Sequence, residues 1–122
     1  MTGRVLLIED EANIAEALQF ILTRAGWQVT IHTDGTTALA RVRAVRPDVL
    51  VLDVMLPGLS GYEILDGLRA DPLLADLPVL ILTARGQEQE RAIATARGAT
   101  MFMTKPFANA DILANMRQLM ER

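Results

Sequence analysis

The chain has 122 residues, of which 51% are hydrophobic, with a net charge of −3 and no cysteine. This length is typical of one domain, so we expect residues 1–122 to form a single domain. The composition excludes a disulfide framework and thiolate chemistry, shows no basic stripe for nucleic acid, and has no apolar run of the roughly 20 residues that span a bilayer. Residues 1–4 lead directly into a strand and leave no room for a signal peptide, so we expect a cytoplasmic location.

The first half of the chain alternates strand-like and helix-like segments. Residues 5–8 are an apolar run, and residues 12–25 follow with hydrophobic side chains at helical spacing. Residues 27–31 alternate apolar and polar side chains, which is typical of a half-exposed edge strand. A turn at residues 34–35 leads into a second helix, which must end before Pro47.

The second half repeats this pattern after a fully apolar strand at residues 49–52. Ser60 and Glu63 have the spacing of a capping box, which predicts a helix through about residue 70. The remaining predicted elements are a strand at 79–82, a helix at 87–97, a strand at 101–103 and a helix from about residue 109. The helix at 87–97 has a thin expected apolar stripe of Ala92, Ile93 and Ala96.

Strict alternation of strands and helices indicates an α/β fold. Parallel strands need crossover connections, and these are right-handed, so helices come to cover both faces of the sheet. We therefore predict a doubly wound, five-stranded parallel sheet with five helices, arranged as a three-layer sandwich.

Polar side chains lie at the ends of four of the predicted strands. Glu9 and Asp10 follow the first strand, Asp53 the third, Thr83 the fourth and Lys105 the fifth. All strands of a parallel sheet leave the core in one direction, and ligands bind just beyond their carboxyl ends. Each residue alone could be a helix cap or a solvated side chain, but helix capping does not explain the acids and the lysine together.

The charges of this cluster suggest its chemistry. Asp10 and Asp53 repel each other and Glu9 adds to the repulsion, so the site needs cations. Lys105 supplies one positive charge, and the oxygen ligands suit Mg²⁺. With the hydroxyl of Thr83, these groups can neutralise a phosphoryl group during transfer, with one carboxylate as the nucleophile that becomes an aspartyl phosphate.

On these residues the chain resembles a response-regulator receiver domain of two-component signal transduction, of the chemotaxis-regulator type, over essentially its whole length. The motifs that carry the resemblance are Leu7-Ile8-Glu9-Asp10-Glu11, Asp53-Val54-Met55-Leu56-Pro57-Gly58-Leu59-Ser60-Gly61, Leu82-Thr83-Ala84, and Gly98-Ala99 through Phe102 to Lys105-Pro106-Phe107. The resemblance implies a flavodoxin-like sheet with strand order 2-1-3-4-5. It also implies a phosphorelay switch that assists its own phosphorylation and dephosphorylation but is not a conventional enzyme.

The resemblance gives each site residue an expected role. Asp53 is expected to accept a phosphoryl group from a phosphohistidine of a histidine kinase or histidine phosphotransfer protein. Lys105 is expected to pair with the phosphoryl oxygens, directed by a cis peptide bond before Pro106. Thr83 is expected to move toward the phosphoryl group and let Phe102 swing inward.

The same resemblance gives the metal ligands. Asp10 is expected to bind Mg²⁺ directly, together with Asp53, while Glu9 acts partly through water and Met55 offers its backbone carbonyl. Met55 and Arg85 hold positions that flank the phosphoryl group in the family and tune its lifetime. An apolar Met55 would position an attacking water poorly, so we expect a fairly long-lived phosphorylated state.

The output is expected at a face formed by the fourth helix, the fifth strand and the fifth helix. This face could bind a downstream effector, which the sequence does not identify, or form a homodimer. Many relatives carry acids that make salt bridges across such a dimer, and this chain lacks them at Ala96, Thr100 and Met101. No effector domain follows Arg122, so the chain is expected to be either a stand-alone receiver or one cut from a longer protein.

Three alternatives to a phosphorylated switch remain open at this stage. An inactive receiver-like interaction module would not need the full set of acids, Thr83 and Lys105. A flavodoxin-like carrier of FMN needs a phosphate-binding loop after the first strand, where the acids at residues 9–11 would repel phosphate. A Mg²⁺-dependent phosphatase with an aspartyl nucleophile usually has a second aspartate two residues later, where this chain has Met55.

Overall fold

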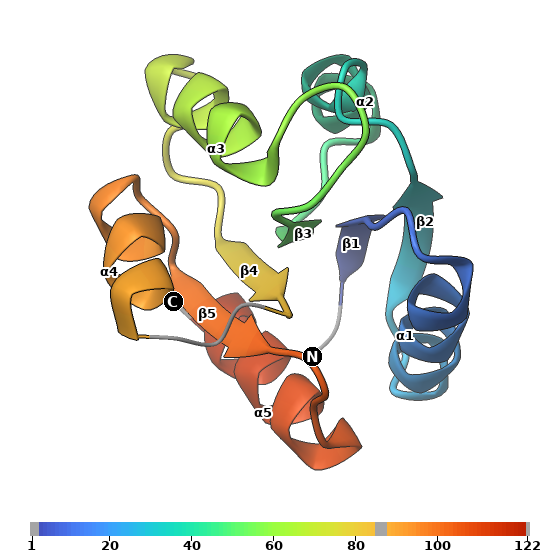
Figure 1. Ribbon diagram of the computed structural model, residues 1–122. Helices are drawn as coiled ribbons and strands as arrows, with labels where there is room; N and C mark the ends of the chain where they lie inside the picture. The colour runs from blue at the N-terminus through green and yellow to red at the C-terminus, as the bar shows by residue number, and fades with distance from the viewer. Residues whose placement is uncertain (1–2, 85–87, 122) are drawn as a thin grey trace.

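The computed structural model describes residues 3–84 and 88–121, in which strands and helices alternate along the chain (Figure 1). The strands are β1 (Arg4–Ile8), β2 (Gln28–His32), β3 (Val49–Asp53), β4 (Val79–Thr83) and β5 (Met101–Thr104). The helices are α1 (Ala12–Arg24), α2 (Ala38–Val45), α3 (Gly61–Ala70), α4 (Glu88–Ala96) and α5 (Asn109–Met120).

The strands form one parallel sheet in the order β2-β1-β3-β4-β5, which confirms the predicted topology. The chain first builds outward from β1 to β2 and then returns to place β3 on the other side of β1. Such a switch point opens a crevice beyond the carboxyl ends of the two central strands. Ile8 is in register with Leu52, so the residues that follow β1 come out beside the end of β3.

Two hydrophobic cores cover the two faces of the sheet. Successive residues of a strand point to opposite faces, so neighbouring residues of β1 enter different cores. Leu7 packs on one face with Leu18 of α1 and Met116 of α5. Leu6 packs on the other face with Ile64 of α3, in a core that also includes residues of α2 and α4. Figure 1 shows α1 and α5 on one side of the sheet and α2, α3 and α4 on the other, which confirms the three-layer sandwich.

Two local predictions are also confirmed. β2 lies at an edge of the sheet and is only partly buried, as expected for a half-exposed edge strand. The capping box at the start of α3 is formed in both directions. The Ser60 hydroxyl accepts a hydrogen bond from the Glu63 N–H at 3.3 Å, and the Glu63 carboxylate accepts one from the Ser60 N–H, also at 3.3 Å.

The predicted buried stripe of α4 is wrong. Ala94 is the buried residue of this helix, and the structure exposes the three residues of the predicted stripe, Ala92, Ile93 and Ala96. The guanidinium of Arg91 lies 4.9 Å from the ring centre of Phe102 on β5. Arg91 and Ala94 are three positions apart and share a helix face, so this is the face that α4 turns toward the sheet. Residue 87, where the helix was predicted to begin, lies outside the described residues.

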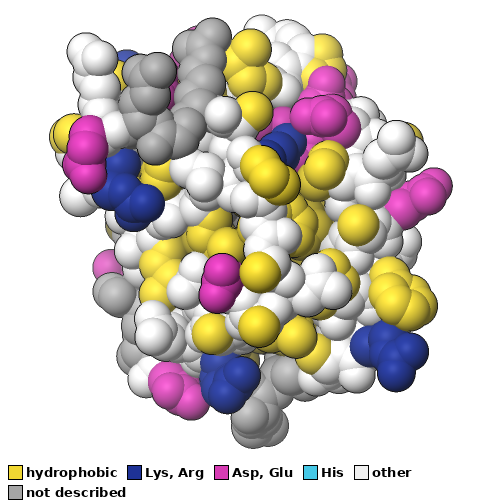
Figure 2. Space-filling model, turned by 60° about the horizontal axis from the view of Figure 1, so that its bottom comes forward, with side chains coloured by type: hydrophobic (Ala, Val, Ile, Leu, Met, Phe, Trp, Pro, Cys, Tyr) yellow, Lys and Arg dark blue, Asp and Glu magenta, His cyan; other side chains and the backbone are white. Residues whose placement is uncertain are grey.

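The surface of the domain mixes apolar and charged side chains. The face drawn in Figure 2 shows hydrophobic side chains in patches separated by polar atoms, with Lys, Arg, Asp and Glu around them. Within residues 3–84 and 88–121, no helix combines the length and apolar character that crossing a bilayer requires.

Candidate functional site

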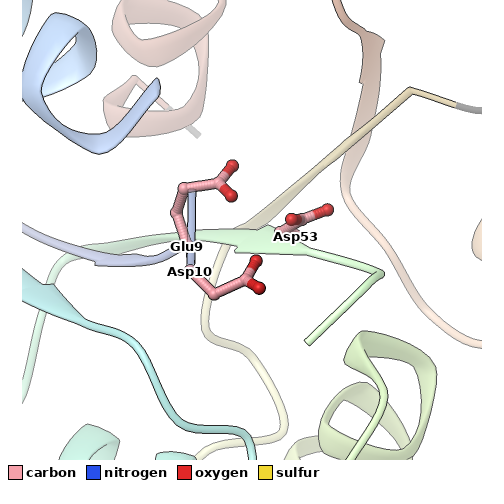
Figure 3. A group of neighbouring side chains, drawn as sticks. All are labelled: Glu9, Asp10 and Asp53. Atoms are coloured by element: carbon pink, nitrogen blue, oxygen red, sulfur yellow. The ribbon is translucent and has the colours of Figure 1, made fainter. Parts of the chain in front are cut away.

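Three acidic side chains meet at the carboxyl end of the central strands. Glu9 and Asp10 follow β1, and Asp53 is the last residue of β3. One carboxylate oxygen from each lies within 4.8 Å of the others, and Figure 3 shows the three side chains reaching into one region beyond the strands. Glu9 is 1% exposed and Asp53 is 2% exposed, whereas Asp10 is exposed to solvent. Two of the three charges are therefore held away from water.

The backbone around these acids is fixed by hydrogen bonds. The Glu9 N–H continues the ladder beyond β1 by donating to the carbonyl of His32 at 3.0 Å. After Asp53 a loop leads to α3, and the N–H of Gly61 closes it by donating to the carbonyl of Val54 at 2.9 Å. A side chain at Gly61 would overlap the backbone carbonyl of Asp53, so glycine lets α3 begin directly against the end of β3.

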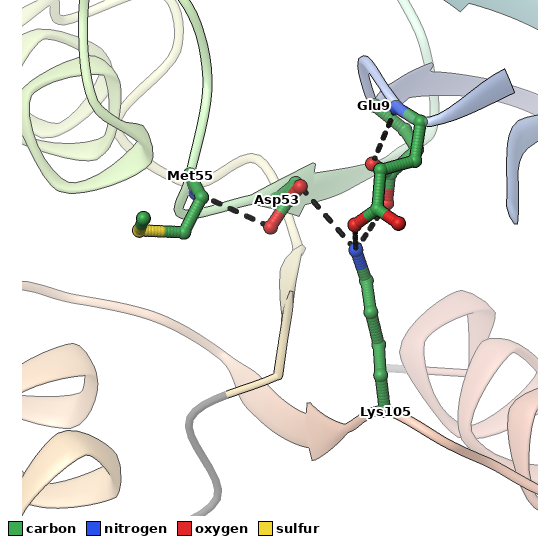
Figure 4. Close-up of polar contacts among 5 residues, drawn as sticks. Glu9, Asp53, Met55 and Lys105 are labelled. Carbon is green, nitrogen blue, oxygen red and sulfur yellow. Dashed lines mark hydrogen bonds and ion pairs between the residues drawn. The ribbon is translucent and has the colours of Figure 1, made fainter.

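Lys105 reaches the same region from β5. Its backbone N–H donates to the carbonyl of Thr83 at 2.8 Å, which extends the β4–β5 pairing one residue beyond the strand. The Lys105–Pro106 peptide bond is cis, as the resemblance implied. The ammonium Nζ lies 2.8 Å from Glu9 Oε1, 3.1 Å from Glu11 Oε1 and 3.3 Å from Asp53 Oδ2 (Figure 4). The side chain is only 9% exposed, so these carboxylates form most of its surroundings.

Burial and charge act on these groups in opposite directions. Burial raises the pKa of Glu9 above its ordinary value, although the ammonium of Lys105 works to lower it. Burial alone would lower the pKa of Lys105, but the contacts with Glu9, Glu11 and Asp53 outweigh it and the pKa of Lys105 is raised. The lysine is therefore held charged, while Glu9 is a carboxylate that its site only partly compensates.

The acids fit a hard divalent cation. Within the described part of the chain, Glu9 Oε1 is buried and receives no well-aligned hydrogen bond, so its compensation is the charge of Lys105 alone. The donor set consists of oxygen atoms from Glu9, Asp10 and Asp53. Mg²⁺ prefers oxygen ligands and keeps several waters, and the exposed Asp10 leaves one side of this cluster open to water.

Of the other predicted site residues, the structure describes Met55, Thr83 and Phe102. Thr83 is fully buried at the end of β4. Met55 donates its backbone N–H to Asp53 Oδ1 at 3.2 Å, while its side chain points largely into solvent (Figure 4). Phe102 already lies inward on β5, 8% exposed and packed in the core beneath α4. Arg85, which was predicted to flank the site, lies outside the described residues.

One contact of the site was missed from the sequence. Glu11 was quoted only as part of a motif, yet its carboxylate accepts a hydrogen bond from Lys105. Its backbone N–H also donates to Glu9 Oε2 at 3.1 Å. The signal in the sequence was the unbroken acidic run at residues 9–11, directly after a buried strand.

Comparison with known proteins decides the family. A family model described as "Response regulator receiver domain" matches residues 5–117 of the chain. The chain belongs to this family. It is thus a receiver domain of the kind found in two-component response regulators, as the motifs at both ends of the sequence indicated.

Individual relatives agree with this assignment. The receiver domain is 37% identical to the phosphate regulon transcriptional regulatory protein PhoB of Escherichia coli over 122 residues, which are 100% of this chain and 53% of PhoB. Among solved structures, the chemotaxis protein CheY4 of Vibrio cholerae superposes with a TM-score of 0.89 at 28% identity, covering 98% of this chain and 99% of that one. The receiver domain of the sensor histidine kinase PA1611 from Pseudomonas aeruginosa, solved with a magnesium ion coordinated in its active site cleft, gives a TM-score of 0.91 at 25% identity, with full coverage of both chains.

The receiver domain spans about half the length of the curated relatives it matches.

Proposed function

We propose that this receiver domain is a signalling switch that accepts a phosphoryl group on Asp53 from a phosphohistidine donor. The observation that carries the proposal is the position of Asp53, which is buried at the end of β3 with the ammonium of Lys105 3.3 Å from Oδ2. Burying a carboxylate beside other acids costs stability, and such arrangements are concentrated at functional sites. The donor is proposed to be a histidine kinase or a histidine phosphotransfer protein.

The chemical step is a transfer of the phosphoryl group from nitrogen to oxygen. A carboxylate oxygen of Asp53 forms a bond to phosphorus while the bond from phosphorus to the donor imidazole breaks. The imidazole nitrogen leaves with the electron pair and takes up a proton. Lys105 is proposed to neutralise charge on the phosphoryl oxygens, since its ammonium already lies at Asp53.

The acids are proposed to hold Mg²⁺ during this step. Asp10, Asp53 and Glu9 are the side-chain ligands that the oxygen cluster supports, and the backbone carbonyl of Met55 is the proposed fourth protein group. The magnesium ion in the cleft of the PA1611 receiver domain supports the same choice of metal here. When bound, Mg²⁺ would supply positive charge to the acids and to the phosphoryl oxygens.

The response is proposed to pass through Thr83 and Phe102 to the face formed by α4, β5 and α5. Thr83 would turn its hydroxyl toward the phosphoryl group, and Phe102 would be held inward in the switched state. An unidentified downstream effector, or a second copy of the domain, would then bind this face. The homodimer is the less favoured partner, because Thr100 uses its hydroxyl to accept a hydrogen bond from the Val79 N–H and offers no acid to a partner.

The same proposal covers the organisation of the chain. Residues 1–122 are proposed to be one receiver domain, working in the cytoplasm without contacting nucleic acid itself. It would assist its own phosphorylation and dephosphorylation without being a conventional enzyme. Met55, whose apolar side chain is 54% exposed beside Asp53, is proposed to lengthen the life of the phosphorylated state, and a lifetime of seconds or less in the isolated domain would contradict this.

The test is phosphotransfer from a panel of phosphorylated histidine kinases in the presence of Mg²⁺. We expect a mass increase of one phosphoryl group on the wild type and none on Asp53→Asn, which keeps the shape of the side chain but removes its nucleophilic charge. Equal labelling of both proteins would refute Asp53 as the acceptor. Absorbance at flavin wavelengths, or turnover of phosphate monoesters, would instead favour the FMN carrier or the phosphatase.

A further inference from the structure

We propose that Glu11 is a positioning residue that holds Lys105 in the resting receiver domain and releases it when a phosphoryl group arrives on Asp53. This inference rests on the proposed function, because it concerns the same lysine. In this proposal the carboxylate of Glu11 and the phosphoryl group compete for the ammonium of Lys105.

The position of the Glu11 side chain is the first observation. Glu11 is the residue that precedes α1, a position where short polar side chains such as Asp or Ser accept a hydrogen bond from the first N–H groups of the helix. In this structure Glu11 makes no such capping bond. Its Oε1 instead accepts a hydrogen bond from Lys105 Nζ at 3.1 Å, across 94 positions of the sequence. Because the helix end gains no cap from it, the contact with Lys105 needs its own explanation.

The hydrogen-bonding capacity of Lys105 is the second observation. An ammonium has three N–H donors. In the resting domain it donates hydrogen bonds to Glu11 Oε1 and Asp53 Oδ2 and forms an ion pair with Glu9 Oε1 at 2.8 Å. The side chain is 9% exposed, so the ammonium has little contact with water. A phosphoryl oxygen that binds this ammonium therefore competes with the carboxylates that already surround it.

The exposure of the three carboxylates decides which one leaves. Glu9 is 1% exposed, so its carboxylate would stay buried without its lysine partner, which is strongly destabilising. Asp53 carries the phosphoryl group and stays in place. The Glu11 side chain is 60% exposed, so water can solvate its carboxylate as soon as the contact breaks. Glu11 is thus the partner that can be exchanged at the smallest cost.

The backbone of Glu11 does not depend on this exchange. Its N–H donates to Glu9 Oε2, and this bond belongs to the main chain, so a change of the Glu11 side chain leaves it available. Glu11→Gln is therefore a mild substitution that removes one negative charge. Glu16→Gln is the matched control, since Glu16 is exposed on α1 and its substitution changes the net charge equally.

The experiment measures binding of beryllofluoride, a phosphoryl mimic, to the wild type and both variants at saturating Mg²⁺ by isothermal titration calorimetry. Loss of the competing contact should lower the apparent Kd of Glu11→Gln by about two- to fivefold, the range that exposed ion pairs support. Glu16→Gln should match the wild type. The gain of Glu11→Gln should shrink at high salt, because salt screens an exposed pair.

Unchanged or weaker binding by Glu11→Gln would overturn the inference, and so would an equal gain in Glu16→Gln, which would indicate a general charge effect. These outcomes leave the proposed function standing, provided that the wild type binds beryllofluoride and Asp53→Asn does not. Failure of the wild type to bind would overturn both.

Discussion

At the two ends of the sheet, polar side chains serve different partners. Where the strands begin, they bond to the backbone: Arg69 donates to the carbonyls of Gly98, Leu74 and Ala75 at 2.9, 3.3 and 3.0 Å. Where the strands finish, the acids crowd one another and share one lysine. The hydrogen bonds of Arg69 stabilise the fold. The acidic cluster costs stability, and its proposed use is to bind a cation and a phosphoryl group.

A large cavity does not mark the candidate site. A hollow of about 890 Å³, with Asp48, Arg69 and Thr100 in its lining, lies where the strands begin. Its polar groups already have backbone partners, since Asp48 Oδ2 accepts from the Arg4 N–H at 2.9 Å and Thr100 from Val79. Incomplete compensation of buried charge, rather than volume, distinguishes the site. The comparison predicts that substitutions at one end change stability and those at the other end change binding.

The largest effect is expected from Arg69→Met. Methionine keeps much of the apolar stem but removes the Arg69 hydrogen bonds to the partly buried carbonyls of Gly98 and Ala75. The Leu74 carbonyl keeps a bond from the Leu77 N–H. We therefore expect a loss of about 2–4 kcal/mol in the free energy of unfolding. Chemical denaturation measures this loss. The Mg²⁺ affinity of the folded variant should stay close to that of the wild type, and a large drop in it would break the distinction between the two ends.

Magnesium should give the next largest effect. An ion that binds only the folded state at about 100 times its Kd adds about 2.7 kcal/mol, so Tm should rise along a Mg²⁺ titration. Asp10→Asn should remove most of this rise, because it takes away an exposed ligand without disturbing the core. Asp34→Asn, an acid at the same end of the sheet with local partners, should keep it. A Tm that stays constant to high millimolar Mg²⁺ would count against the metal site.

The cost of burying Glu9 should appear in the pH dependence of the stability. Its pKa is raised in the folded protein, chiefly by burial, so its contribution to stability is complete below the unfolded pKa of about 4.3 and is lost as pH rises through the folded value. In metal-free buffer, Glu9→Gln should therefore gain stability relative to the wild type as pH rises from about 4 toward neutral. Denaturation curves at several pH values measure this difference in unfolding free energy between Glu9→Gln and the wild type. A variant that loses stability relative to the wild type as pH rises would contradict the raised pKa.

Substitution of Asp34 should have the smallest effect on stability, with a pH dependence opposite to that of Glu9. Its Oδ1 accepts hydrogen bonds from the Thr36 hydroxyl at 2.6 Å and the Thr36 N–H at 2.9 Å, and these lower its pKa. Its contribution is present above the unfolded pKa of about 3.9 and is lost as pH falls through the lower folded value. Asp34→Ala should be slightly less stable than the wild type at pH 5 to 7, with the difference in Tm fading toward pH 2. A difference that persists there would exclude charge as its cause.

The sequence was sufficient for the layers of the fold and for most of the site. Apolar runs of strand length, separated by helical segments, left a parallel sheet as the natural arrangement, and the polar residues after those runs had to meet at one edge. Two kinds of detail were out of reach. The rotation of α4 was one of them, because alanines at 92, 94 and 96 give almost no periodic signal.

The sequence also does not predict the contacts of Arg69 with backbone carbonyls. Nothing in the identity of Arg69 indicates that its partners are backbone oxygens of residues 74, 75 and 98, because any residue has such an oxygen. Glu11 was hidden for another reason. It sits where a helix cap was the simplest interpretation, and only the path of the Lys105 side chain shows which partner it takes.

The backbone bond from Lys105 to the carbonyl of Thr83 has a mechanical consequence. It links the backbone of Lys105 to β4, so a shift of this backbone either breaks the bond or moves the end of β4 with it. The ammonium of Lys105 can then follow a new charge by rotation about the side-chain bonds while the backbone stays in place. Any remaining pull on the Lys105 backbone would reach Thr83 on β4, which pairs with β3, the strand that carries Asp53.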